Sequence, residues 1–89
     1  MEERYLEIIY RDGRAFAAYL YLPRSPGVTS SRTEVLGEGL VMDYDADGHA
    51  IGLEITAPGQ VTIEQINQAL ARVGEAPLSA EELAPLAAA

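Results

Sequence analysis

The chain opens with two runs in which apolar side chains recur at every second position, the pattern of paired β-strands. The first run extends from Arg4 to Tyr10 and the second from Ala15 to Leu22. Asp12 and Gly13 lie between them, and this dipeptide is typical of a two-residue type I′ turn. The sequence therefore predicts a tight β-hairpin, with Asp12 and Gly13 as its turn-forming residues.

Two more extended segments are expected before residue 57. Residues 23–32 contain two prolines, a glycine and three serines, which predict a surface loop. A third strand is expected within 33–44, where Gly37 and Gly39 are candidate interruptions, and a fourth within 49–56. Because consecutive strands joined by short connections usually pair, we expect a four-stranded antiparallel meander over residues 5–57.

The turn between the last two strands is expected at Asp45–Gly48, as a type I turn with Asp at its first position and Gly at its fourth. A four-residue turn would place Met42 opposite Ile51 and Leu40 opposite Leu53, which forms one apolar stripe and is the register we favour. A three-residue turn with a glycine bulge would instead place Asp43 opposite Ile51.

After residue 61 the spacing of the apolar residues changes to the three- and four-residue spacing of a helix. Thr62 and Gln65 have the spacing of a capping box, and Gly74 suits the C-terminal end of a helix. Four apolar residues then recur at helical spacing: Ile63, Ile66, Leu70 and Val73. We predict one helix over 62–74, a short second helix over 79–84 that begins with a Ser79–Glu82 capping box, and a frayed tail over 85–89. The fold class is therefore α+β in a single domain, 1–89.

Both faces of the first two strands are apolar, and one helix can cover only one face of the sheet. The other face would expose four residues: Tyr5, Ile9, Tyr19 and Tyr21. Exposed aromatic patches of this size are unusual on monomers and typical of interfaces. We therefore expect this face to bind a second copy of the chain, most simply as a homodimer, or another protein. The alternative is that the C-terminal tail folds over this face.

The segment from Asp43 to Glu54 matches the calcium-loop pattern D-x-[DN]-x-[DN]-G-x5-E. Its candidate ligands are Asp43, Asp45, Asp47 and Glu54. A working calcium loop lies between two helices, whereas the flanks here have the composition of strands. We favour a hairpin turn and keep weak binding of a divalent cation as the alternative.

The same segment, from Gly39 to Ile55, resembles the signature of the prokaryotic domain-of-unknown-function family 2283. Members of that family read Asp-Tyr-Asp, a polar position, Asp-Gly, and then an aliphatic-Gly-Ile-Glu-Ile run; Leu53 stands here where isoleucine is usual. The resemblance covers roughly residues 5–57. It implies a small β-meander followed by a helix, and it implies no activity.

The amino-acid composition argues against several classes of function. Fourteen acidic residues against six arginines give a net charge of −8, which argues against binding nucleic acid through a basic patch. Cysteine is absent, no apolar run is long enough to span a membrane, and no signal peptide is evident, so we expect a cytoplasmic protein. His49 has no nucleophile near it in sequence. We therefore expect no catalysis and no cofactor, and a self-associating interaction module, with an antitoxin-like partner of a basic protein as a further alternative.

Overall fold

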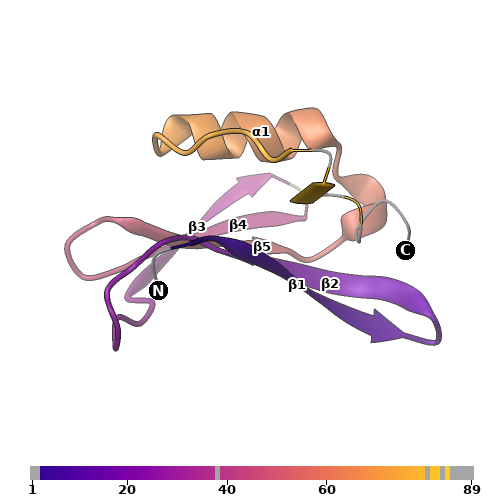
Figure 1. The fold of residues 1–89 in the computed structure, drawn as a ribbon, viewed down its shortest axis with the longest axis horizontal. Helices are drawn as coiled ribbons and strands as arrows, with labels where there is room; N and C mark the ends of the chain where they lie inside the picture. The colour runs from indigo at the N-terminus through magenta and orange to yellow at the C-terminus, as the bar shows by residue number, and fades with distance from the viewer. Residues whose placement is uncertain (1–2, 38, 80, 83, 85–89) are drawn as a thin grey trace.

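The computed structural model describes residues 3–37, 39–79, 81, 82 and 84, and it places one helix over one face of a single antiparallel sheet (Figure 1). The fold class is α+β, as predicted. The strands are β1 (Tyr5–Arg11), β2 (Arg14–Tyr21), β3 (Arg32–Gly37), β4 (Leu40–Tyr44) and β5 (Ala50–Ile55). A short 3-10 helix, η1 (Pro58–Gln60), leads into the helix α1 (Ile63–Arg72).

The predicted four-stranded meander is wrong, because the sheet has five strands in the order β1-β2-β5-β4-β3. The expected third strand is divided into β3 and β4, which form a hairpin around Gly39. This glycine has φ +82°, a left-handed conformation that favours glycine. A Cβ atom at Gly39 would also lie 2.8 Å from Val61 Cγ2. The chain therefore reverses there, and β5 returns between β4 and β2.

The central place of β5 follows from its side chains. Ile51, Leu53 and Ile55 are each at most 1% exposed. A strand in the middle of the sheet is shielded by neighbours on both sides, so the most apolar strand of the second half is stable there. β5 pairs with β2 (Leu20 opposite Leu53) and with β4 (Met42 opposite Leu53).

The register that we favoured for the second hairpin is also wrong. At the turn, Tyr44 lies opposite Ala50, which is the pairing of the three-residue alternative. The register then shifts between Asp43 and Tyr44, so that Met42 lies opposite Leu53 rather than Ile51. A bulge leaves one extra residue on one strand, here Ile51. The observed register differs by two residues from the one that we favoured. Because side chains alternate with a period of two, the same apolar side chains of β4 and β5 still face the core.

The local signals of the remaining elements are confirmed. Asp12 (φ 54°) and Gly13 (φ 77°) form the first turn, and Arg11 lies opposite Arg14. Thr62 Oγ1 accepts a hydrogen bond from the Gln65 backbone N–H, and the Gln65 side chain accepts one from the Thr62 N–H. At the other end of α1 the Glu75 N–H donates to the Leu70 carbonyl, beyond a left-handed Gly74.

The core lies between α1 and the sheet face that it covers. Its buried members from the sheet are Ala18, Leu20, Leu40, Met42, Leu53 and Ile55, and Leu22, which directly follows β2, joins them. Its members from the C-terminal third are Ile66, Ala69, Leu70 and Leu78. No helix in the described part of the chain is long and apolar enough to cross a membrane.

Arg4 joins the start of the sheet to the segment that follows α1. Its guanidinium donates to Glu82 Oε2 at 2.9 Å and Oε1 at 3.1 Å, and to the carbonyls of Ala76 and Pro77. Ser79 and Glu82 form the predicted capping box, with bonds of 3.0 and 3.1 Å. Residues 81, 82 and 84 are helical, whereas residues 80 and 83 and the predicted frayed tail, 85–89, lie outside the described residues.

We expect the Arg4–Glu82 pair to make stability sensitive to acid. The hydrogen bonds from Arg4, and then the one from the Ser79 N–H, lower the pKa of Glu82 from 4.5 to about 2. The ionised form is favoured by folding, so its contribution is complete above about pH 4.5 and is lost as the pH falls toward 2. At neutral pH, Arg4→Ala should lower the free energy of unfolding by about 1–2 kcal/mol, since the pair is partly screened by solvent.

Urea unfolding of the wild type and of Arg4→Ala, at neutral pH and at about pH 2, measures this effect. The difference between the two proteins should shrink at the acidic pH. Arg72→Ala is the control, because its ion pair with Glu34 is long, 3.7 Å, and largely exposed. A loss for Arg4→Ala no larger than that for Arg72→Ala would contradict the expectation.

Candidate functional site

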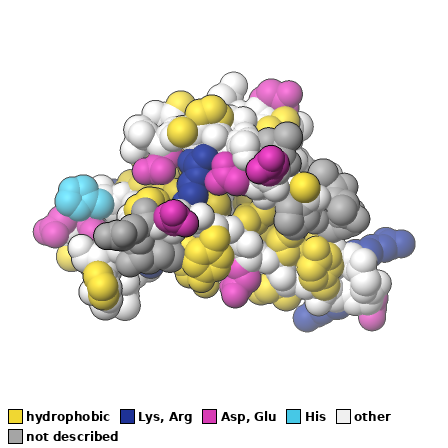
Figure 2. Space-filling model, in the orientation of Figure 1, with side chains coloured by type: hydrophobic (Ala, Val, Ile, Leu, Met, Phe, Trp, Pro, Cys, Tyr) yellow, Lys and Arg dark blue, Asp and Glu magenta, His cyan; other side chains and the backbone are white. Residues whose placement is uncertain are grey.

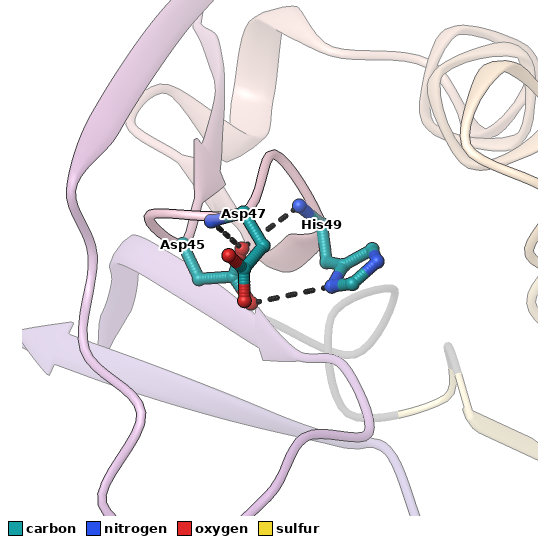
Figure 3. Close-up of side chains that lie close together, drawn as sticks. All are labelled: Asp45, Asp47 and His49. Carbon is teal, nitrogen blue, oxygen red and sulfur yellow. Dashed lines mark hydrogen bonds and ion pairs between the residues drawn. The ribbon is translucent and has the colours of Figure 1, made fainter.

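The acidic turn between β4 and β5 brings together Asp45, Asp47 and His49 (Figure 3). One ligand-type atom from each of the three lies within 4.8 Å of the others. Asp45 Oδ1 accepts hydrogen bonds from the backbone N–H groups of His49 and Asp47, both at 2.9 Å, and Oδ2 lies 3.5 Å from His49 Nδ1. The backbone N–H of His49 is the largest cause of the lowered pKa of Asp45. This carboxylate therefore caps the turn.

The predicted set of calcium ligands is not brought together. The flanks of the loop are strands, as we expected, and the Gly48 N–H donates to the Asp45 carbonyl in the predicted turn. Asp43 and Glu54 belong to the sheet, opposite Gly52 and Val41 respectively, and Asp43 accepts a hydrogen bond from Tyr19. Of the four residues, only Asp45 and Asp47 are grouped at the turn, and the sequence did not predict that His49 would join them.

A shallow hollow of about 330 Å³ beside the turn is lined by Ser25, Asp45 and His49, among others. Serine, aspartate and histidine together are residue types that relay a proton in hydrolytic sites. Within the described residues, however, no hydrogen bond joins Ser25 to His49, and the His49 side chain is 80% exposed. The geometry is that of a capped hairpin tip beside a loop.

The predicted aromatic surface lies on the face of the sheet opposite α1, which we call the open face (Figure 1). The rings of Tyr5 and Tyr21 are stacked, with centroids 4.5 Å apart, and the ring of Tyr19 meets that of Tyr21 edge-on at 4.7 Å. Ile9 lies opposite Ala17 on the same face. Tyr5 is 51% exposed and Ile9 54%. In Figure 2, hydrophobic side chains gather along the strand layer below the helix, with acidic side chains between them.

Tyr19 has a structural role that the sequence alone did not suggest. Its ring lies over Gly52, on the neighbouring strand, and occupies the space that a Cβ atom there would need. Its hydroxyl donates a 2.8 Å hydrogen bond to Asp43 Oδ2, on the strand beyond. Tyr19 therefore reaches from β2 across β5 to β4. A glycine inside a strand is the signal that marks such a close approach.

The environment of Tyr19 favours its neutral form. Burial, and then the hydrogen bond to Asp43, raise the pKa of Tyr19 from 10.0 to about 12. Because the folded-state pKa is the higher one, this contribution to stability is complete below about pH 10 and is lost as the pH rises to about 12. Tyr19 is thus held in place, whereas Tyr5, Tyr21 and Ile9 form the accessible part of the surface.

The sheet order adds residues to the open face that sequence alternation could not assign. Glu7, Tyr19 and Glu54 lie side by side on β1, β2 and β5. Val41 and Val35 continue the same row on β4 and β3, and Val35 is 73% exposed. The open face is therefore an apolar surface that carries carboxylates in its middle.

The family described as a protein of unknown function (DUF2283) matches residues 12–57, which is 46 of the 89 residues. The matched segment runs from the first turn to the end of β5, and it includes Tyr19, Asp43 and Gly52. No curated protein and no solved structure matches the chain.

Proposed function

Because the chain belongs to the DUF2283 family, whose function is unknown, we propose from its own surface that it is a non-catalytic protein-interaction module. The docking surface is the open face of the sheet. The observation that carries this proposal is the stacked pair Tyr5 and Tyr21, with the exposed Ile9 further along β1, on a face that no described helix covers.

The composition of the open face suits binding to another protein. Tyrosine combines a large apolar ring with a polar hydroxyl, so it tolerates exposure to water and still contributes area when it is covered. Two contacts between tyrosine rings are already formed in the free chain: Tyr5 is stacked on Tyr21, and the ring of Tyr19 meets that of Tyr21 edge-on. Such pre-ordered rings lose little side-chain entropy when a partner binds.

The acidic turn supports no comparable proposal. Two of the four residues that we predicted as cation ligands, Asp43 and Glu54, lie on β4 and β5 rather than at the turn. The carboxylate of Asp45 already accepts two backbone N–H groups. The geometry of the turn is thus accounted for by its role in the hairpin.

Two exposed apolar residues of the first hairpin provide a matched test of the docking surface. Ile9 is 54% exposed and Phe16 is 50% exposed. Ile9 lies opposite Ala17 on the open face, whereas Phe16 alternates along β2 with the buried Ala18 and Leu20 and so belongs to the face of the core. Affinity capture from the native host with Ile9→Ser should lose a partner that both the wild type and Phe16→Ser retain.

Retention of the same proteins by all three baits would contradict the proposal. Self-association, which we predicted from the sequence, is tested on the same proteins by sedimentation equilibrium. A dimer that Ile9→Ser dissociates and Phe16→Ser leaves intact would identify a second copy as the partner on the open face.

A further inference from the structure

The open face carries two carboxylates on the strands either side of Tyr19. Glu7 lies opposite Tyr19 across the β1–β2 pair, and Glu54 lies opposite Tyr19 across the β2–β5 pair. Neighbouring strands are about 4.8 Å apart, so the backbones of the two glutamates are separated by roughly 10 Å. Both side chains are exposed. The sheet thus places negative charge at its centre, because β5 is the middle strand.

Neither carboxylate has a partner of opposite charge among the described residues. Among the described residues, Glu54 forms no hydrogen bond or ion pair, and the contact of Glu7 is a 3.4 Å hydrogen bond from the Tyr21 hydroxyl. A partner that covered the open face without supplying positive charge would have to remove water from both, which is costly for an unpaired charge. The surface therefore favours a partner that carries cations.

The chain itself shows that its aromatic rings accept a guanidinium. Arg24 lies over the ring of Tyr21, with 5.4 Å between the guanidinium carbon and the ring centroid. Elsewhere, Arg11 lies 4.2 Å from the Phe16 centroid and Arg32 lies 4.2 Å from that of Tyr44. A ring flanked by carboxylates attracts a cation through both the ring and the charges.

We propose that the partner of the open face is a basic polypeptide segment whose arginine or lysine side chains pair with Glu7 and Glu54, beside the Tyr21 ring that Arg24 of the chain already covers. This inference rests on the proposed docking function and adds the chemistry of the partner. The net charge of −8 supports it, because long-range attraction then favours encounter with a basic protein.

A second copy of the chain complements this surface less well. In a symmetric face-to-face pair the same patch meets itself, and the two Glu54 side chains, each on a middle strand, would approach one another. The pair would also bring together two chains of charge −8. Charge complementarity therefore selects a basic partner over a homodimer on this face.

The test is a titration of the full chain with a short peptide in which arginine and valine alternate, followed by calorimetry at low and at physiological salt. The control peptide has glutamate in place of arginine. The arginine peptide should bind, more weakly at the higher salt, and the glutamate peptide should not. Glu54→Gln should weaken binding about tenfold, the usual loss when a charge-assisted pair is broken at a partly covered site.

Glu64→Gln is the matched control, because it removes the same charge from an exposed position in the first turn of α1. Equal losses for Glu54→Gln and Glu64→Gln would show attraction by net charge alone and would overturn the inference. The two proposals can fail separately. If Ile9→Ser loses a host partner that Glu54→Gln retains, the open face is a docking surface, and only the basic character of the partner is rejected. A dimer held together through the open face would also overturn the inference of a basic partner.

Discussion

Replacing Gly52 with alanine is expected to destabilise the protein by about 1–3 kcal/mol, the usual range for overpacking a filled space. A Cβ atom at this position would collide with Oη and Cζ of Tyr19. Since these are atoms of one rigid ring, the whole ring must move away from β5. The hydrogen bond from Tyr19 to Asp43 would then be lost as well.

The same substitution should have the opposite sign when Tyr19 is absent. Gly52 is not among the glycines with a left-handed backbone, so alanine fits its conformation, and glycine in a strand interior is unfavourable relative to a residue with a side chain. In a Tyr19→Ala background, Gly52→Ala should be neutral or stabilising. Urea unfolding of the four proteins measures the coupling directly.

A spectroscopic readout separates this mechanism from a general loss of stability. In the wild type, one tyrosine should ionise at a pKa of about 12, and Gly52→Ala should return it toward 10.0 as the ring leaves its buried place beside Asp43. Equal costs of Gly52→Ala with and without the Tyr19 ring would contradict the arrangement of Tyr19 over β5.

Truncating Leu53 to alanine should have the largest effect of any substitution in the sheet, about 2–5 kcal/mol. Leu53 is 0% exposed and lies between Leu20 and Met42 in the middle of the five strands. A domain of this size has a total stability of roughly 5–15 kcal/mol. Leu53→Ala should therefore remove a large fraction of the total stability, which urea unfolding followed by circular dichroism would measure.

Val35→Ala provides the contrast, because Val35 is 73% exposed on the edge strand β3 and its truncation should change stability by less than about 0.5 kcal/mol. The comparison also tests the strand order. In the meander that we predicted, residues 49–56 would form an edge strand. Amide hydrogen exchange should instead be slowest in β5, and faster exchange there than in β1 would contradict a central β5.

The features that could be predicted from the sequence are those fixed by neighbours in the chain. Asp12 and Gly13 determine the first turn, Thr62 and Gln65 cap the helix, and Asp45 begins the second turn, because each acts on backbone groups within a few residues. The division of apolar residues between the two faces of β1 and β2 was also predictable, since strand alternation is a local property.

The strand order and the register could not be obtained in this way. β5 lies beside β2 because of burial shared by residues more than thirty positions apart, such as Leu20 and Leu53. The bulge at Ile51 depends on how the whole apolar stripe of β4 and β5 fits against α1. Gly39 was recognised as a possible interruption of the third strand. A continuous strand through Gly39 and a hairpin around it differ only in tertiary packing, so the local sequence did not separate them.

The candidate site, too, could be predicted only as far as local alternation allows. Tyr5, Ile9, Tyr19 and Tyr21 could be assigned to one face from alternation alone. The contact of Tyr19 with Gly52, and the position of Glu54 beside Tyr19, require knowledge of which strands are neighbours. The charge at the centre of the open face, and with it the chemistry of the partner, therefore follows from the structure.

Nuclear magnetic resonance of the tyrosine rings during titration with the arginine–valine peptide shows which face of the sheet the peptide contacts. Of the five tyrosines, Tyr5, Tyr19 and Tyr21 lie on the open face, and Tyr44 packs against the core on the other face. If the open face binds a basic segment, the peptide shifts the ring signals of Tyr5 and Tyr21 and leaves that of Tyr44 unchanged. A shift confined to Tyr44, or no shift at a saturating concentration of peptide, would contradict binding to the open face.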